Sequence, residues 1–214
     1  NIAWGGSGES GGDGGSEGDS TSRSDNRQLD AVSTRSGDGG LPKLRRNKWI
    51  NRQVTRVANS GNLQRLLQTI QYHISEMNAI NLVTALHRVT KLAVSCPDSA
   101  ASVEKLLKHP SFRQLSSTVV QRIEAGLSPE VAGSAPPFEV QCMSIVCWSC
   151  ATLRLQEERL MSAIAGIALE RLGELKPFEL SNMVWAYAKL AMGSPQLFQG
   201  VSQRMLHRGF GEFS

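Results

Sequence analysis

Two stretches, MSIVCWSCATL (residues 143–153) and LSNMVWAYAKL (residues 180–190), decide the fold class of this 214-residue chain. Aligned at an offset of 37 residues, they share an apolar first residue, a serine, a tryptophan, an alanine and a final leucine. A third stretch, LVTALHRVTKL (residues 82–92), aligns with the last one at an offset of 98 and has His87 at the tryptophan position. In all three, apolar residues recur every three or four positions, which is the pattern of an amphipathic helix.

The same helical spacing continues outward from these three motif helices, and beyond residue 60 there is no alternating strand pattern. It predicts helices near residues 62–75, 82–92, 99–108, 111–126, 143–153, 157–172, 180–190 and 195–208. Each motif helix is followed by a helix of a second type, so the unit is a helix pair with a period of about 37–38 residues. One pair cannot bury its apolar face alone, and neighbouring pairs must cover it. We therefore predict an all-α solenoid of stacked antiparallel helix pairs over residues 61–214.

The first two motif helices are further apart than the last two. From His87 to Trp148 the step is 61 residues rather than 37, which we attribute to long connections at residues 94–110 and 127–137. Because the chain stops just after a helix of the second type, we expect the array to continue in a longer protein.

The first 41 residues differ in composition from the rest. Residues 1–40 hold 11 of the 20 glycines, together with seven acidic residues and three arginines. With so few apolar side chains, the segment cannot offset the cost of ordering its backbone, about 1–2 kcal/mol per residue. We predict a disordered tail with a charge of −4, which leaves +8 for the other 174 residues of a chain whose net charge is +4. The tail lacks the composition of an organellar transit peptide, and no run of 18 apolar residues predicts a membrane span.

A basic segment follows the tail. Residues 41–65 read LPKLRRNKWINRQVTRVANSGNLQR and hold seven positive charges, and no acid occurs between Asp38 and Glu76. We treat residues 42–60 as a basic linker. Positive charges interleaved with Trp49 suit a phosphate backbone and one stacked base. Two alternatives stay open, a solvated entry to the domain with Trp49 and Ile50 packed on the first helix, and a nuclear-import signal.

Residues that suggest catalysis or metal binding are few. Cys147 and Cys150 form a CxxC pair, but it lies inside a predicted helix, whereas a redox pair opens one. Zinc would need a second ligand pair, and none is present. The four histidines are scattered, and no phosphate-binding loop occurs. We therefore predict packing roles for the cysteines and expect neither an enzyme, a metal site nor a cofactor.

The segment GELKPFELSNMVWAYAKL (residues 173–190) resembles octotricopeptide repeats and the related repeats beside RAP domains in FAST-kinase-like proteins. Their pattern is approximately P-x-E-L-S-N-x-x-W-A-x-A-x-L. The matching residues are Pro177, Glu179, Leu180, Ser181, Asn182, Trp185, Ala186, Ala188 and Leu190. The middle copy keeps Ser144, Trp148, Ala151 and Leu153, and the first keeps only the apolar frame. Helical-repeat accessory proteins of kinetoplastid mitochondrial RNA editing are also similar.

The resemblance implies an α-helical repeat protein that binds RNA in mitochondria or chloroplasts. In repeat proteins that read RNA, two or three side chains of each unit meet one base, and Arg and Lys contact phosphates. The candidate RNA-binding residues on the polar stripe of the motif helices are Thr84, Arg88, Lys91, Ser144, Thr152, Ser181, Asn182 and Lys189. Those of the basic segment are Lys43, Arg45, Arg46, Lys48 and Trp49. Trp148 and Trp185 are expected to pack between helices.

The expected function is thus non-catalytic binding of single-stranded RNA in processing, stabilisation, editing or ribosome biogenesis. Ribosomal or RNA-processing proteins are expected as further partners, and neither a membrane nor a small-molecule substrate is. No RAP domain is visible, so the nuclease-like activity of that module is not implied. The alternative is a protein–protein scaffold, for example a helical-repeat subunit of an organellar ribosome.

Overall fold

In the computed structural model, residues 43–126 and 138–208 are described, and their regular structure is entirely helical, without a strand. The α-helices in this part of the chain are α1 (Lys43–Asn59), α2 (Leu63–His73), α3 (Ala79–Val94), α4 (Ser99–Lys108), α5 (Pro110–Ala125), α6 (Val140–Leu153), α7 (Glu158–Glu170), α8 (Pro177–Lys189) and α9 (Pro195–Arg208). Two 3₁₀ turns, η1 (Ile74–Glu76) and η2 (Leu172–Glu174), follow α2 and α7. The prediction of an all-α protein is confirmed. The predicted tail (1–41) and the connection at 127–137 lie outside the described residues.

Helix α1 differs from the linker that we expected at residues 42–60. It is a regular helix of 17 residues, and Ile50, Val54 and Ala58 on one face are buried. The spacing of four residues between these three places them on a single stripe, which packs against α2 and α3. The apolar stripe has only one residue per turn, and it was not recognised among the many charged residues of this segment.

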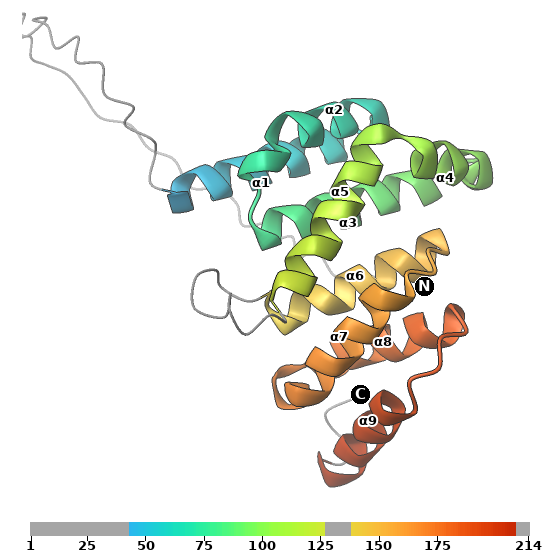
Figure 1. Ribbon diagram of the computed structural model, residues 1–214. Coiled ribbons are helices and arrows are strands. Elements are labelled where there is room, and N and C mark those ends of the chain that lie inside the picture. Colours follow the sequence, from blue (N-terminus) through green and yellow to red (C-terminus); the bar gives the residue numbers. More distant parts are fainter. Residues whose placement is uncertain (1–42, 127–137, 209–214) are drawn as a thin grey trace, which may run out of the picture. The chain divides into compact units, whose positions relative to one another are not determined.

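The helices are arranged in two layers, within which each helix contacts the next (Figure 1). In the first, α1 contacts α3, α3 contacts α6, and α6 contacts α8. In the second, α2 contacts α5, α5 contacts α7, and α7 contacts α9. Helix α4 packs on both α3 and α5, and lies within the long connection between them. The three motif helices are therefore consecutive members of one layer, and α1 precedes them.

The start of α8 shows why the motif residues form a helix here. Pro177 occupies the first turn, where its missing N–H costs no hydrogen bond. The carboxylate of Glu179 accepts a hydrogen bond of 2.7 Å from the backbone N–H of Lys176, which satisfies a donor at the helix N-terminus. Leu180 and Met183 are fully buried. The first residues of the motif thus cap and anchor the helix.

The helices are joined by an apolar core and a few polar contacts between elements far apart in the sequence. Within the first layer, Asn81 on α3 donates to the carbonyl of Asn47 on α1 at 3.0 Å. Arg204 on α9 donates to the carbonyl of Leu175 before α8 at 2.7 Å. None of the described helices is long and apolar enough to cross a membrane.

Equivalent positions of the motif helices differ in burial according to whether a further helix covers them. Ser144 and Ala151 of α6 are buried, and α6 packs against α3, α7 and α8. Their aligned residues on α8, Ser181 and Ala188, are exposed. The exposed side of α8 thus presents positions that are buried on α6.

Candidate nucleic-acid interface

The hairpin of α1 and α2 is the most positively charged part of the described chain. Between Lys43 and Ile74 the sequence holds seven basic residues and no acid. The exposed basic residues among these are Arg45, Lys48, Arg52, Arg56 and Arg65. None of these five forms an ion pair with a described residue. No acidic side chain in that part of the chain pairs with them, so they are available to a polyanion, whose binding releases counterions.

Arg46 is the one base of α1 with an acidic partner among the described residues. Its Nε and Nη2 atoms donate to the two carboxylate oxygens of Glu76, both at 2.8 Å. The same guanidinium lies 4.8 Å from the centre of the Trp49 ring. The hydrogen bonds from Arg46 lower the pKa of Glu76. This pair ties α1 to η1, so the candidate Arg46 has a structural partner and is less available than its neighbours for a phosphate.

Trp49 and His73 form the aromatic end of the same hairpin. Their rings meet edge to face at 5.2 Å, and the Trp49 side chain remains partly exposed. Burial, and then the charge of Arg46, lowers the pKa of His73, so its imidazole is neutral at pH 7. The structure thus keeps candidate Trp49 at the surface. Candidate Lys43 begins α1, and its side chain lies outside the described set.

The polar stripe of the motif helices is present, but it is less uniform than we expected. Lys91, Ser181 and Lys189 are exposed, and Thr84, Arg88, Thr152 and Asn182 are half-buried. Arg88 donates to the side chain of Asn59 at 3.4 Å. Because aligned residues of packed neighbouring helices share a face, Thr84, Lys91, Thr152, Asn182 and Lys189 belong to one surface, which we name the motif face.

Ser144 does not belong to this surface. Its side chain is 1% exposed, and its hydroxyl donates to the carbonyl of Gln141 at 2.9 Å. The sequence alignment places it beside Ser181, which is exposed only because no described helix covers that side of α8. Ser144 is therefore a packing residue, and the candidate role in RNA contact is wrong for it.

The tryptophan position of the motif runs across the same face. His87 and Trp148 are in edge-to-face contact at 5.1 Å. Trp185 is 42% exposed, and the Nζ of Lys189 lies 4.6 Å from its ring centre. Trp148 packs between helices as we expected, whereas Trp185 presents a large part of its ring to solvent. An exposed ring beside a cation can stack with a base.

The CxxC pair is buried within α6. Burial raises the pKa of the Cys150 thiol to about 12 and also raises that of Cys147. Cys142, on the same helix, has a pKa of about 11 for the same reason. Within residues 43–126 and 138–208 no group of three or more His, Cys, Asp or Glu residues is placed to hold a metal ion.

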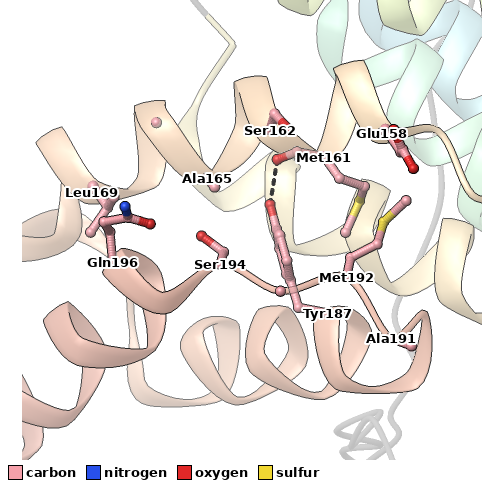
Figure 2. A pocket seen from close by; sticks show the side chains of 12 residues that line it. Glu158, Met161, Ser162, Ala165, Leu169, Tyr187, Ala191, Met192, Ser194 and Gln196 are labelled. Atoms are coloured by element: carbon pink, nitrogen blue, oxygen red, sulfur yellow. Dashed lines mark hydrogen bonds between the residues drawn. The ribbon is translucent and has the colours of Figure 1, made fainter.

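A hollow of about 530 Å³ lies between α7 and the connection from α8 to α9 (Figure 2). Its walls are mainly small residues and methionines, including Ala165, Gly166 and Met192. Tyr187 enters from α8, and its hydroxyl donates to the carbonyl of Met161 (Figure 2). Burial raises the pKa of this phenol. No described side-chain hydrogen bond joins Ser162 or Ser194 to another lining residue of this hollow, whose walls are otherwise mainly apolar.

A second hollow lies in the hairpin of α1 and α2, and sequence reasoning missed it. It measures about 360 Å³, and the basic and aromatic residues around it include Arg56, Arg65 and Tyr72. The signal was available in principle, because Trp49, Gln53 and Arg56 follow helical spacing. Without knowing that residues 43–59 form a helix, we could not place them on one face.

Comparison with protein-family models, with curated proteins and with solved structures finds no match to this chain. The resemblance to octotricopeptide repeats therefore stands on the residues of α8 and of the two weaker copies alone.

Proposed function

We propose that this protein binds single-stranded RNA without chemistry of its own, and that its helix pairs are units of a helical-repeat solenoid. The observation that carries the proposal is the hairpin of α1 and α2, with seven basic residues, no acid and an exposed tryptophan. Double-stranded nucleic acid is a poorer fit, because exposed aromatic rings stack on bases that are not already paired.

Two surfaces contribute to RNA binding in this proposal. The exposed cations of α1 and α2 supply the sequence-independent attraction to phosphates. The motif face supplies hydroxyl, amide and ammonium groups at aligned positions of consecutive helices, which can bond base edges. The repeat supports this division, because α6 and α8 begin 37 residues apart at Val140 and Pro177, and α7 and α9 begin 37 residues apart at Glu158 and Pro195.

The biological setting follows from the resemblance of α8. Octotricopeptide and RAP-associated repeats act in mitochondria and chloroplasts, so we place this protein in organellar RNA processing, stabilisation, editing or ribosome biogenesis. Contacts with ribosomal or RNA-processing proteins belong to the same proposal.

The test is a binding titration of the full chain against a pool of fluorescent single-stranded RNAs over a range of salt concentrations. We expect salt-sensitive binding, with log K falling by about 0.7 per log unit of salt for each phosphate neutralised. The triple variant Arg45→Gln/Lys48→Gln/Arg52→Gln should weaken binding to every RNA. The charge-matched control is Lys105→Gln/Arg113→Gln/Arg122→Gln, which changes exposed residues of α4 and α5. Absence of salt-sensitive binding by the unaltered chain would refute the proposal.

The role of the motif face is tested separately. The variant Arg88→Ala/Lys91→Ala/Lys189→Ala removes three cations from or beside this face. If it binds the RNA pool as tightly as the unaltered chain does, RNA binding stands and the motif face is not its site.

A second function, a protein–protein scaffold, is favoured by one observation. The exposed part of α8 carries Phe178 and Trp185, which are 44% and 42% exposed. Large exposed apolar side chains on one helix often mark an interaction surface. If this function is right, Phe178→Ser/Trp185→Ser abolishes capture of a partner protein, whereas the Arg45→Gln/Lys48→Gln/Arg52→Gln variant of α1 leaves that capture intact.

A further inference from the structure

The hollow between α1 and α2 has an ordered arrangement of side chains along its length. From α1 come Trp49, Gln53 and Arg56, and from α2 come Arg65, Gln68 and Tyr72. Trp49 and Arg56 are seven residues apart, and so are Arg65 and Tyr72. Seven residues are almost two helical turns, so the two members of each pair lie on the same side of their helix, about 10 Å apart along its axis.

The two helices run in opposite directions, which brings like residues together. The turn at Gly61, with φ of +74°, joins the end of α1 to the start of α2. Arg56 and Arg65 therefore share the end of the hollow near the turn, and Trp49 and Tyr72 share the other end. His73 contacts both rings of that end edge to face, with its centroid 5.2 Å from that of Trp49 and 4.7 Å from that of Tyr72.

The aromatic end offers a free surface for stacking. Tyr72 is 78% exposed, although an aromatic ring at the surface loses the benefit of burial. Its ring stands at 87° to that of His73, so the two rings are not stacked on each other. A base that stacks on Tyr72 would cover apolar area that is now in water.

The cationic end suits phosphate. Arg56 and Arg65 are exposed, and neither pairs with an acid among the described residues. The Nη2 of Arg56 donates to the side-chain oxygen of Gln53 at 2.9 Å, which holds the guanidinium beside the hollow. A guanidinium presents paired donors that match two oxygens of one phosphate. The side-chain amides of Gln53 and Gln68 lie between the two ends and can bond the edge of a base.

We propose that this hollow is a nucleotide subsite for single-stranded RNA, with one base on the Tyr72 and Trp49 end and the adjoining phosphates on Arg56 and Arg65. The inference rests on the proposed function and adds a specific place for one nucleotide outside the motif face. It also predicts how a bound strand lies along the hollow, because its base and its phosphates occupy opposite ends.

The experiment measures the affinity of the full chain for oligouridine by fluorescence anisotropy at several salt concentrations. Tyr72→Ala should weaken binding about 5- to 100-fold without changing the salt dependence, because it removes stacking and no charge. Tyr72→Phe should restore the affinity. Arg56→Gln/Arg65→Gln should weaken binding and lower the slope of log K against log salt by about 1.4, which is two phosphates at about 0.7 each. The charge-matched control Lys105→Gln/Arg122→Gln should leave both quantities near those of the unaltered chain.

Photocrosslinking locates the base directly. An oligouridine with one 5-iodouridine should crosslink to Tyr72 or Trp49, as identified by mass spectrometry of the digested complex. If the crosslink maps only to Trp185 or to other residues, the subsite is refuted. If poly-glutamate displaces the RNA as well as unlabelled oligouridine of equal charge does, the hollow is a general anion site and the proposal also fails.

Failure of this inference and failure of the proposed function give different results. An unaltered chain that binds no oligouridine and no other single-stranded RNA removes both. An unaltered chain that binds oligouridine, with the Tyr72→Ala and Arg56→Gln/Arg65→Gln variants equal to it, removes the subsite and leaves RNA binding in place.

Discussion

The imidazole of His87 on α3 and the indole of Trp148 on α6 are in edge-to-face contact, with ring centroids 5.1 Å apart. The two residues occupy the same position of the repeated motif, although 61 residues of chain separate them. The contact therefore joins equivalent points of adjacent helices across an interface. The contact also includes a titratable group, so we expect its protonation to be coupled to the stability of that interface.

Lowering the pH from 7 to 5 should destabilise the protein through His87. Burial, with further contributions from Arg88 and Lys91, lowers the pKa of His87 from 6.5 to about 4. Below pH 6.5 the unfolded chain takes up a proton that the folded chain takes up only near pH 4, so stability falls across that window. Because the ring is partly exposed, solvent screening reduces the effect, and we expect a loss of about 1 kcal/mol at pH 5.

The measurement is urea unfolding at both pH values for the unaltered chain and for His87→Phe, which keeps an aromatic ring against Trp148. The variant should lose about half or more of the pH dependence, and His73, whose pKa burial also lowers, should contribute to what remains. An identical pH dependence in the two proteins would show that His87 is not the titrating group.

Glu76→Gln should have opposite effects on stability and on RNA binding. It removes the carboxylate that accepts both hydrogen bonds from Arg46, so the tie between α1 and η1 weakens and the melting temperature falls. It also frees a guanidinium on the basic hairpin, so affinity for oligouridine should rise about two- to fivefold. Calorimetry and anisotropy on the same preparation check the two effects.

The control is Glu104→Gln, which removes the same charge from α4, where Glu104 accepts a 2.6 Å hydrogen bond from Lys108. It changes the net charge equally but lies outside the basic hairpin, so RNA affinity should stay close to that of the unaltered chain. Equal gains in the two variants would mean that total charge governs binding, and that the hairpin has no special role.

The cysteines should differ in reactivity although none is in a disulfide. Cys96 is half-buried, and Cys142, Cys147 and Cys150 are buried. Burial raises the pKa of the three buried thiols, and the thiolate is the reactive form. An aromatic disulfide reagent should therefore label Cys96 first, and all four only in denaturant. Loss of the fast reaction in Cys96→Ala identifies that residue, whereas fast labelling of Cys147 or Cys150 would revive a redox role for the CxxC pair.

The sequence predicted the helices well because their signal is local. Apolar spacing and caps such as Pro177 and Glu179 act within one or two turns, and each helix predicted within the described residues is present near its expected bounds. Helix α1 was not predicted, because its apolar stripe is narrow and surrounded by arginines. The stripe consists of Ile50, Val54 and Ala58. The charge of that segment was evident from the sequence, but its packing against α2 was not.

The candidate site was harder to predict, because exposure depends on neighbours in space. The alignment equates Ser144 with Ser181, yet only one of them reaches solvent. Tyr72 belongs to no motif, and it became a candidate only because the hairpin places it on the same hollow as Trp49. Sequence patterns could therefore indicate the class of residue involved, whereas the packing order of the helices decides which residues of that class are available.

The packing order itself makes a prediction at one repeated position. Ala151 on α6 and Ala188 on α8 are aligned residues of the motif. Ala151 is fully buried, with α8 packed against its helix, whereas Ala188 is exposed. Ala151→Glu places an unpaired carboxylate in an apolar interface and should destabilise the protein by about 3 kcal/mol or more. Ala188→Glu should stay within about 0.5 kcal/mol of the unaltered chain, since a surface glutamate on a helix is well tolerated.

Urea unfolding of the two variants separates the order of helices from the similarity of their sequences. Helix propensity falls slightly and equally in both substitutions, so it cancels in the comparison. If both variants lose the same stability, then a covering helix protects position 188 as well, and α8 is not at the edge of its layer in solution. If neither loses stability, α6 and α8 do not pack through this position, and the alignment of the two motif helices as adjacent repeat units must be abandoned.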